Sequence, residues 1–153
     1  MNNHQQKNSS FSDSPFIFST IVIFFTILGG RKMAVKLIKI SVVYFVIGVL
    51  IGMYMSMTEA FDFTPVHVHI NLLGWMSLAL AGLIYVGFPN AAETKLAKVH
   101  FWLHNISLPI MMVGLALLVS GIDSAGPVVA VGGTLMVIAI IVFAINILKN
   151  VKQ

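Results

Sequence analysis

The chain has 153 residues, of which 58% are hydrophobic and only 9% are charged. A soluble domain normally carries about 25% charged residues, so this composition excludes that class and indicates a protein of the lipid bilayer. The chain contains no cysteine, which excludes disulfides, thiolate ligation of haem and iron–sulfur clusters. The net charge is +4, but the basic residues stand at the ends of apolar runs. That placement is typical of membrane topology and not of nucleic-acid binding.

The first 32 residues differ in character from the rest. Residues 1–14 are polar, and we expect a disordered tail there. Residues 15–30 form an apolar run that is short for a span, which needs about 20 residues. Three interpretations of this run stay open: an extra transmembrane helix, an interfacial or signal-like segment, or a translated region upstream of a protein that begins at Met33.

Residues 33–153 form the main domain. Long apolar runs predict four transmembrane helices, at about residues 35–57, 65–88, 94–119 and 127–148. The predicted fold is therefore all-α: a polytopic bundle of four membrane helices, with the run at residues 15–30 as a candidate fifth.

Local signals refine this prediction. Thr64 suits an N-cap and Pro65 the first helical position. Pro109 should kink the third helix, because proline removes a helical hydrogen bond. Gly48 and Gly52 form a small-xxx-small pair that permits close helix packing.

The distribution of basic residues predicts how the helices are oriented in the membrane. Lys and Arg lie at the start of the first helix, between the second and third helices, and after the fourth. The other two loops carry Glu59, Asp62 and Asp123 and contain no Lys or Arg. By the positive-inside rule, we expect a multi-pass protein of the inner (cytoplasmic) membrane with a cytoplasmic C-terminus.

Two histidines, His67 and His69, lie in the first two turns of the second predicted helix. Residues two apart on a helix differ by about 200° in direction, so the two rings point to nearly opposite sides. Histidine is rare in membrane helices and usually functional there, and haem b is our first candidate ligand. Asn71, Glu59 and Asp62 are candidate partners for the second ring nitrogen. The alternative is a pair of interfacial histidines that face headgroups or water.

His100 and His104 lie four residues apart on the third helix and therefore share a face. Such a pair can bind one metal ion, or each ring can ligate haem singly. The alternative is a polar packing cluster with Asn105 and Ser107. His104 lies deeper in the membrane and is the better ligand candidate.

Copper is the alternative cofactor. Thioethers favour Cu(I), so His67, His69 and Met57 form a candidate copper site. Against this, methionine is a common apolar filler of membrane cores.

The segment His67-Val68-His69, followed by Leu73-Gly74-Trp75, resembles the tenth helix of subunit I of the haem–copper oxidases, above all the C-type oxidases and nitric oxide reductases. His100-Phe101-Trp102-Leu103 is similar to the start of the next helix. The likeness covers residues 35–148, as a four-helix fragment of a twelve-helix subunit. It implies that the first histidine of His-x-His ligates a high-spin haem and the second a low-spin haem.

The chain also departs from that family. It lacks the three further histidines of the copper or non-haem iron site, the histidine–tyrosine segment, and the second ligand of the low-spin haem. Complete oxygen or nitric oxide reduction by this chain alone is therefore not expected, and whether it catalyses any reaction stays open. The resemblance implies a haem-binding membrane protein that serves electron transfer, sensing or assembly of a respiratory complex.

Two matters stay open beside this hypothesis. The family's twelve helices form three arcs of four, so a homotrimer of this four-helix unit would imitate them. The competing functions are a copper-handling membrane protein and a non-catalytic bundle that packs against a larger respiratory complex.

Overall fold

The computed structural model describes residues 15–151, with side chains from Arg31 onward. Every regular element in this range is helical, which confirms the all-α prediction. The predicted polar tail, residues 1–14, lies outside the described residues. The elements are α1 (Pro15–Thr58), η2 (Phe61–Phe63), α2 (Thr64–His69), η3 (Ile70–Ser77), α3 (Leu78–Gly87), α4 (Pro89–Ala92), α5 (Lys95–Val119), η4 (Asp123–Ala125) and α6 (Gly126–Asn150).

Within the described residues, four helical stretches are long and apolar enough to cross a bilayer, with mean hydropathies between 1.7 and 2.9. The protein is therefore a polytopic membrane protein, as its composition predicted. The four spans are Arg31–Thr58, Phe61–Gly87, Lys95–Val119 and Asp123–Asn150.

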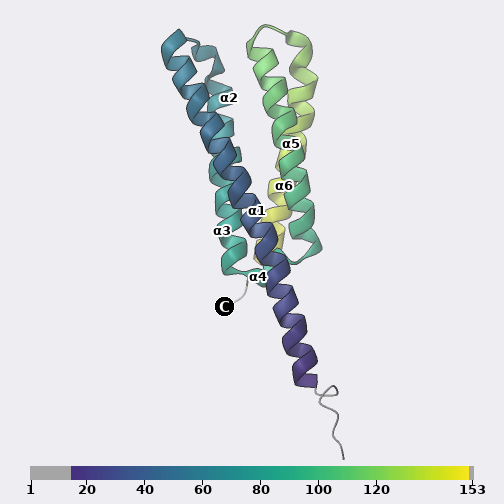
Figure 1. Cartoon of the computed structure of the whole chain (residues 1–153). Helices are drawn as coiled ribbons and strands as arrows, with labels where there is room; N and C mark the ends of the chain where they lie inside the picture. Colours follow the sequence, from purple (N-terminus) through teal and green to yellow (C-terminus); the bar gives the residue numbers. More distant parts are fainter. Residues whose placement is uncertain (1–14, 152–153) are drawn as a thin grey trace, which may run out of the picture.

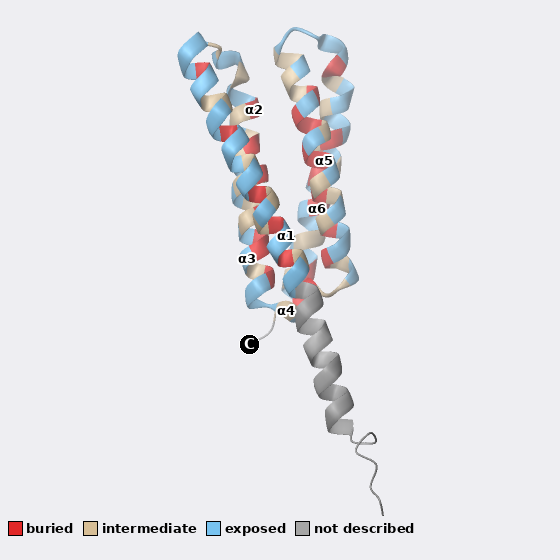
Figure 2. Ribbon diagram, in the orientation of Figure 1, coloured by how far each residue is buried: buried red, intermediate tan, exposed pale blue. Residues whose placement is uncertain are grey.

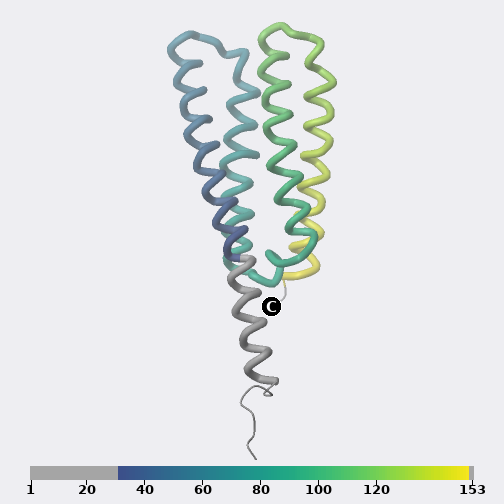
Figure 3. Tube along the Cα trace, turned by 45° about the vertical axis from the view of Figure 1, so that its right-hand side comes forward, coloured from purple at the N-terminus to yellow at the C-terminus, as the bar shows by residue number. Residues whose placement is uncertain are grey.

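The spans run alternately up and down and form two helical hairpins (Figures 1 and 3). The first hairpin pairs α1 with the continuous stack of α2, η3 and α3, and the second pairs α5 with α6. The short helix α4 connects the two hairpins at one end of the bundle. Short loops force this antiparallel order, because each helix must return across the membrane beside its predecessor.

Burial is confined to the inward faces of the helices (Figure 2). A first buried cluster lies toward α4 and includes Leu37, Leu78 and Tyr85. A second cluster joins the two hairpins through Val66 and Leu108. Large apolar side chains are exposed along every span, as expected where lipid replaces water as the solvent.

Three local details differ from the sequence prediction or extend it. Helix α1 is continuous from Pro15 to Thr58, so the apolar run at residues 15–30 belongs to the same helix as the first span, with no break at Gly29 and Gly30. Thr64 is not the N-cap of α2: Phe63 holds that position, and the Thr64 hydroxyl donates to the carbonyl of Phe61 at 2.6 Å. Pro65 does lie in the first turn. Helix α5 runs without a break across Pro109, and the kink there stays a prediction.

Candidate functional site

His67 lies in a slot between α2 and α1. Its Nδ1 is 2.9 Å from the carbonyl oxygen of Gly48. A Cβ added at Gly52 would come within 2.8 Å of His67 Cε1, so this part of α1 has room for the ring only because it carries glycine. A carbonyl only accepts hydrogen bonds, hence Nδ1 carries the proton. The lone pair of His67 is therefore on Nε2, the nitrogen available to a metal.

Asn71, a predicted partner of the second ring nitrogen, lies beside His67, but the Gly48 carbonyl accepts the hydrogen bond of Nδ1. Asn71 Nδ2 donates to the His67 carbonyl at 2.8 Å and lies 3.5 Å from His67 Nδ1. A Cβ at Gly48 would come within 2.6 Å of the Asn71 amide, so Gly48 accommodates this side chain as well. The other predicted partners, Glu59 and Asp62, are exposed, and neither bonds to a histidine in the described part of the chain.

His69 is half-buried and is positioned by its own helix. Its Nδ1 lies 2.7 Å from the carbonyl oxygen of Pro65, one turn earlier, and so donates to it. Nε2 again keeps the lone pair. His67 bonds to α1 whereas His69 bonds within α2, in agreement with the opposite directions that their spacing predicts.

His100 and His104 share the inward face of α5, as predicted. They are 2% and 1% exposed, and their ring centroids lie 5.4 Å apart with the planes at 87°. His104 Nε2 is 3.0 Å from the carbonyl oxygen of Leu73 and donates to it. His104 Nδ1 is buried and has no hydrogen-bond partner. This nitrogen is an unused acceptor in the middle of the bundle.

The carbonyl that His104 contacts belongs to a π-helical segment, η3 (Ile70–Ser77). A π-helix replaces the usual i→i+4 bonds by i→i+5 bonds, and it often marks functional positions. The Ser77 hydroxyl likewise bonds to a residue five positions earlier, donating to the carbonyl of Leu72 at 2.7 Å. Sequence reasoning missed this segment, because its residues carry no signal that separates a π-helix from an α-helix.

A buried polar network surrounds His100. The Tyr85 hydroxyl lies 3.4 Å from His100 Nδ1 and accepts from Asn146 Nδ2 at 3.3 Å. Asn146 also donates to the carbonyl of Ala91 at 2.9 Å and accepts from the Thr94 hydroxyl at 2.6 Å. The network thus connects α3, α4, α5 and α6. Tyr85 and Asn146 were missed from the sequence, although a lone Asn in the apolar run of α6 was the available signal.

A polar packing cluster, the alternative to metal ligation for His100 and His104, is present around these residues, but with largely different members. Ser107 is buried and donates to the His104 carbonyl at 3.3 Å. Asn105 instead donates to the Phe101 carbonyl of its own helix at 2.7 Å. The polar partners from other helices are Tyr85 and Asn146.

The donor set determines which metal chemistry fits the chain. No group of three or more His, Cys, Asp or Glu side chains gathers closely enough to hold a metal ion within the residues that the structure describes. Met57, the predicted thioether ligand, is 76% exposed. His67 and His69 bond to different helices and can each offer one nitrogen. A single donor suits a haem iron, because the porphyrin supplies four further nitrogens.

Comparison of the chain with protein-family models, curated proteins and solved structures found no match. The resemblance to the haem–copper oxidases consequently depends on sequence motifs alone: His67–His69 with Leu73–Trp75, and His100–Leu103.

Proposed function

We propose that this protein is a haem-binding integral membrane protein, with His67 and His69 as axial ligands of haem b. One observation carries the proposal: both Nδ1–H groups donate to backbone carbonyls, at 2.9 and 2.7 Å. Axial histidines are oriented in this way, because the second hydrogen bond holds the ring and makes the free nitrogen a better ligand. Bound haem would supply one-electron transfer or gas binding.

The two rings differ in how much space surrounds them. His67 is confined by Gly52, where any larger side chain would meet the ring. His69 is half-buried and is held by its own helix, and it is not among the close neighbours of the α1 glycines in the described range. We therefore take His69 as the first ligand and His67 as the second. The buried Nδ1 of His104 makes that residue the third candidate, and His100, which bonds to Tyr85, is the fourth.

In this proposal the role is electron transfer, sensing or assembly of a respiratory complex, with an ancestry shared with oxidase subunit I. We also propose that the protein lies in the inner membrane with a cytoplasmic C-terminus; the basic residues Lys95, Lys98 and Lys149 support this orientation by the positive-inside rule. The copper alternative has less support, since Met57, its thioether ligand, is largely exposed.

Absorption spectroscopy tests the proposal. The full chain, purified after haem-replete expression, should show a Soret band and a reduced-minus-oxidised difference spectrum. His69→Ala should lose most of this haem, because it removes the ligand without touching the buried network. Asn105→Ala is the matched control, since Asn105 bonds only within its own helix, and it should keep the haem.

Three results would contradict the haem assignment. The first is the absence of a Soret band in the wild-type protein. The second is stoichiometric copper without haem, which would make this a copper-handling protein. The third is co-purification of a respiratory complex with neither cofactor, which would make it a structural subunit. A haem retained in full by His69→Ala but lost in His104→Ala would move the site to α5.

A further inference from the structure

Four cations gather on one face of α1: Arg31, Lys32, Lys36 and Lys39. At 100° per residue they fall within an arc of about 140°. Together with Val35 they line an open groove of about 400 Å³. The positive charge is therefore concentrated along one hollow and is not spread around the helix.

The groove lies at the depth of lipid headgroups. From Lys39 to Thr58 the helix rises by roughly 29 Å at 1.5 Å per residue. This length matches the hydrocarbon core of a bilayer, which is about 30 Å thick. Lys39 and Lys36 consequently fall at one boundary of that core, where the phosphates of the lipids lie, and Lys32 and Arg31 follow about 10–12 Å beyond Lys39 on the water side.

Within the residues whose side chains the structure describes, no carboxylate neutralises the charge of the groove. All four cationic side chains are exposed. Among the carboxylates in the described range, Glu93 is the one on the α4 side of the bundle, and its Oε1 is buried without a hydrogen-bond partner. No ion pair connects it to these cations in that range. An external anion is the natural counter-charge.

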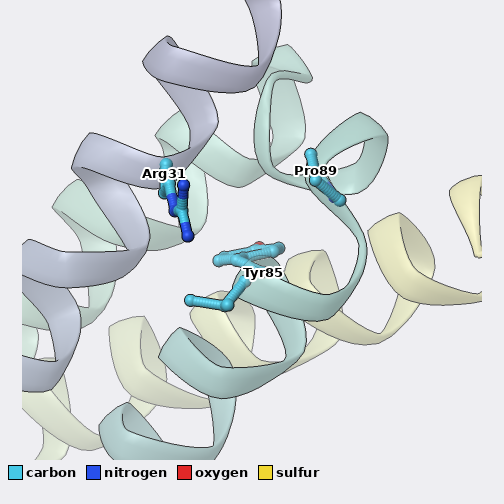
Figure 4. A pocket seen from close by; sticks show the side chains of 4 residues that line it. Arg31, Tyr85 and Pro89 are labelled. Atoms are coloured by element: carbon cyan, nitrogen blue, oxygen red, sulfur yellow. The ribbon is translucent and has the colours of Figure 1, made fainter.

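Arg31 also borders a second hollow. This cavity has a volume of about 100 Å³ and is lined by Arg31, Tyr85, Val86 and Pro89. In Figure 4 the guanidinium of Arg31 points toward the ring of Tyr85, with Pro89 on the far side. Val35, Val86 and Pro89 thus place apolar surface beside the cations. Charged and apolar walls side by side match a phosphate group with attached hydrocarbon.

We propose that this groove binds the phosphodiester headgroup of an anionic phospholipid. The four cations hold the phosphate, and the neighbouring apolar side chains contact the upper part of the acyl chains. The site is independent of the haem proposal and of which face of the membrane the groove occupies.

The experiment measures retained lipid by native mass spectrometry. The full chain is extracted from vesicles of mixed phosphatidylglycerol and phosphatidylcholine. The wild-type protein should retain phosphatidylglycerol selectively. The variant Lys32→Gln/Lys36→Gln/Lys39→Gln should lose it, by about fivefold for each cation removed. The control Lys95→Gln/Lys98→Gln/Lys149→Gln removes the same charge outside the groove and should retain the lipid.

Other outcomes overturn the proposal. Equal loss in both triple variants would mean a general charge effect. Equal retention of both lipids by the wild-type protein would mean that the groove does not distinguish an anionic headgroup from a zwitterionic one. Displacement of the lipid by inorganic phosphate at equal concentration would mean a site for free anions. If the groove variant fails to fold, a salt titration of the wild-type protein tests the proposal. Added salt should weaken the retention of phosphatidylglycerol and leave the retention of phosphatidylcholine constant.

Discussion

At the scale of single residues, the His-x-His motif depends on glycines in a different helix. The His67 ring fits only because position 52 has no side chain, and its hydrogen bond depends on the backbone of Gly48. The predicted small-xxx-small pair therefore does more than let two helices approach. It orients the imidazole of His67 and leaves the Nε2 nitrogen of that ring without a proton.

This dependence predicts the effect of filling the slot. Gly52→Val should destabilise the protein by about 1–3 kcal/mol, because the new side chain overlaps the ring and breaks its bond to Gly48. Unfolding by denaturant in detergent micelles measures the loss. The matched control is Gly87→Val, where an added Cβ meets nothing within 4 Å. A control as unstable as the Gly52 variant would show that valine itself, and not the slot, causes the loss.

At the scale of elements, polar side chains hold together helices that the lipid does not drive together. In a bilayer the hydrophobic effect contributes little to helix association, so packing and hydrogen bonds carry more of it. The Asn146 side chain alone reaches Tyr85 on α3, Ala91 on α4 and Thr94 at the start of α5. It is fully buried, so water cannot replace these partners.

Removal of this side chain should loosen the α4 end of the bundle. Asn146→Leu should cost about 1–3 kcal/mol, because it removes the buried bonds of Asn146 to the Tyr85 hydroxyl, the Ala91 carbonyl and the Thr94 hydroxyl. The comparison is Asn105→Leu, which removes a bond within one helix only and should cost less. Thermal unfolding in the same detergent measures both. A larger loss for Asn105→Leu would contradict the assignment of Asn146 as the connecting residue.

At the scale of the whole molecule, the four-helix unit is small for a haem protein. His69 is half-buried, so a macrocycle held there would lie at the periphery of the unit and would need a further surface to cover it. In the trimer hypothesis, a neighbouring copy would provide that surface.

Native mass measurement in a mild detergent tests this assembly. We expect the mass of three chains, with each chain contributing 16.7 kDa. The apo-protein made by His69→Ala should form the trimer less completely, because the shared group is missing. A mass of one chain for haem-loaded wild-type protein would rule the trimer out.

The properties that follow from local sequence were predictable. Span length, hydropathy and helical periodicity are local, so the four helices, their antiparallel order and the shared face of His100 and His104 could be predicted. The continuity of α1 was not predicted, because the two glycines before Arg31 favour an interruption that the helix does not make. The prediction that Thr64 is an N-cap was wrong for a related reason. A 3₁₀ turn precedes α2, and the Thr64 hydroxyl bonds to the Phe61 carbonyl of that turn.

The tertiary structure alone decided which polar groups meet. The contacts of Leu73 with His104, of Gly48 with His67, and of Tyr85 with Asn146 join residues that are 31, 19 and 61 positions apart. No periodicity within one helix encodes such pairs, because they depend on the rotation and depth at which separate helices pack. The sequence does not show which ring nitrogen of each candidate haem ligand is free. The structure shows it, because it gives the hydrogen-bond partner of the other ring nitrogen.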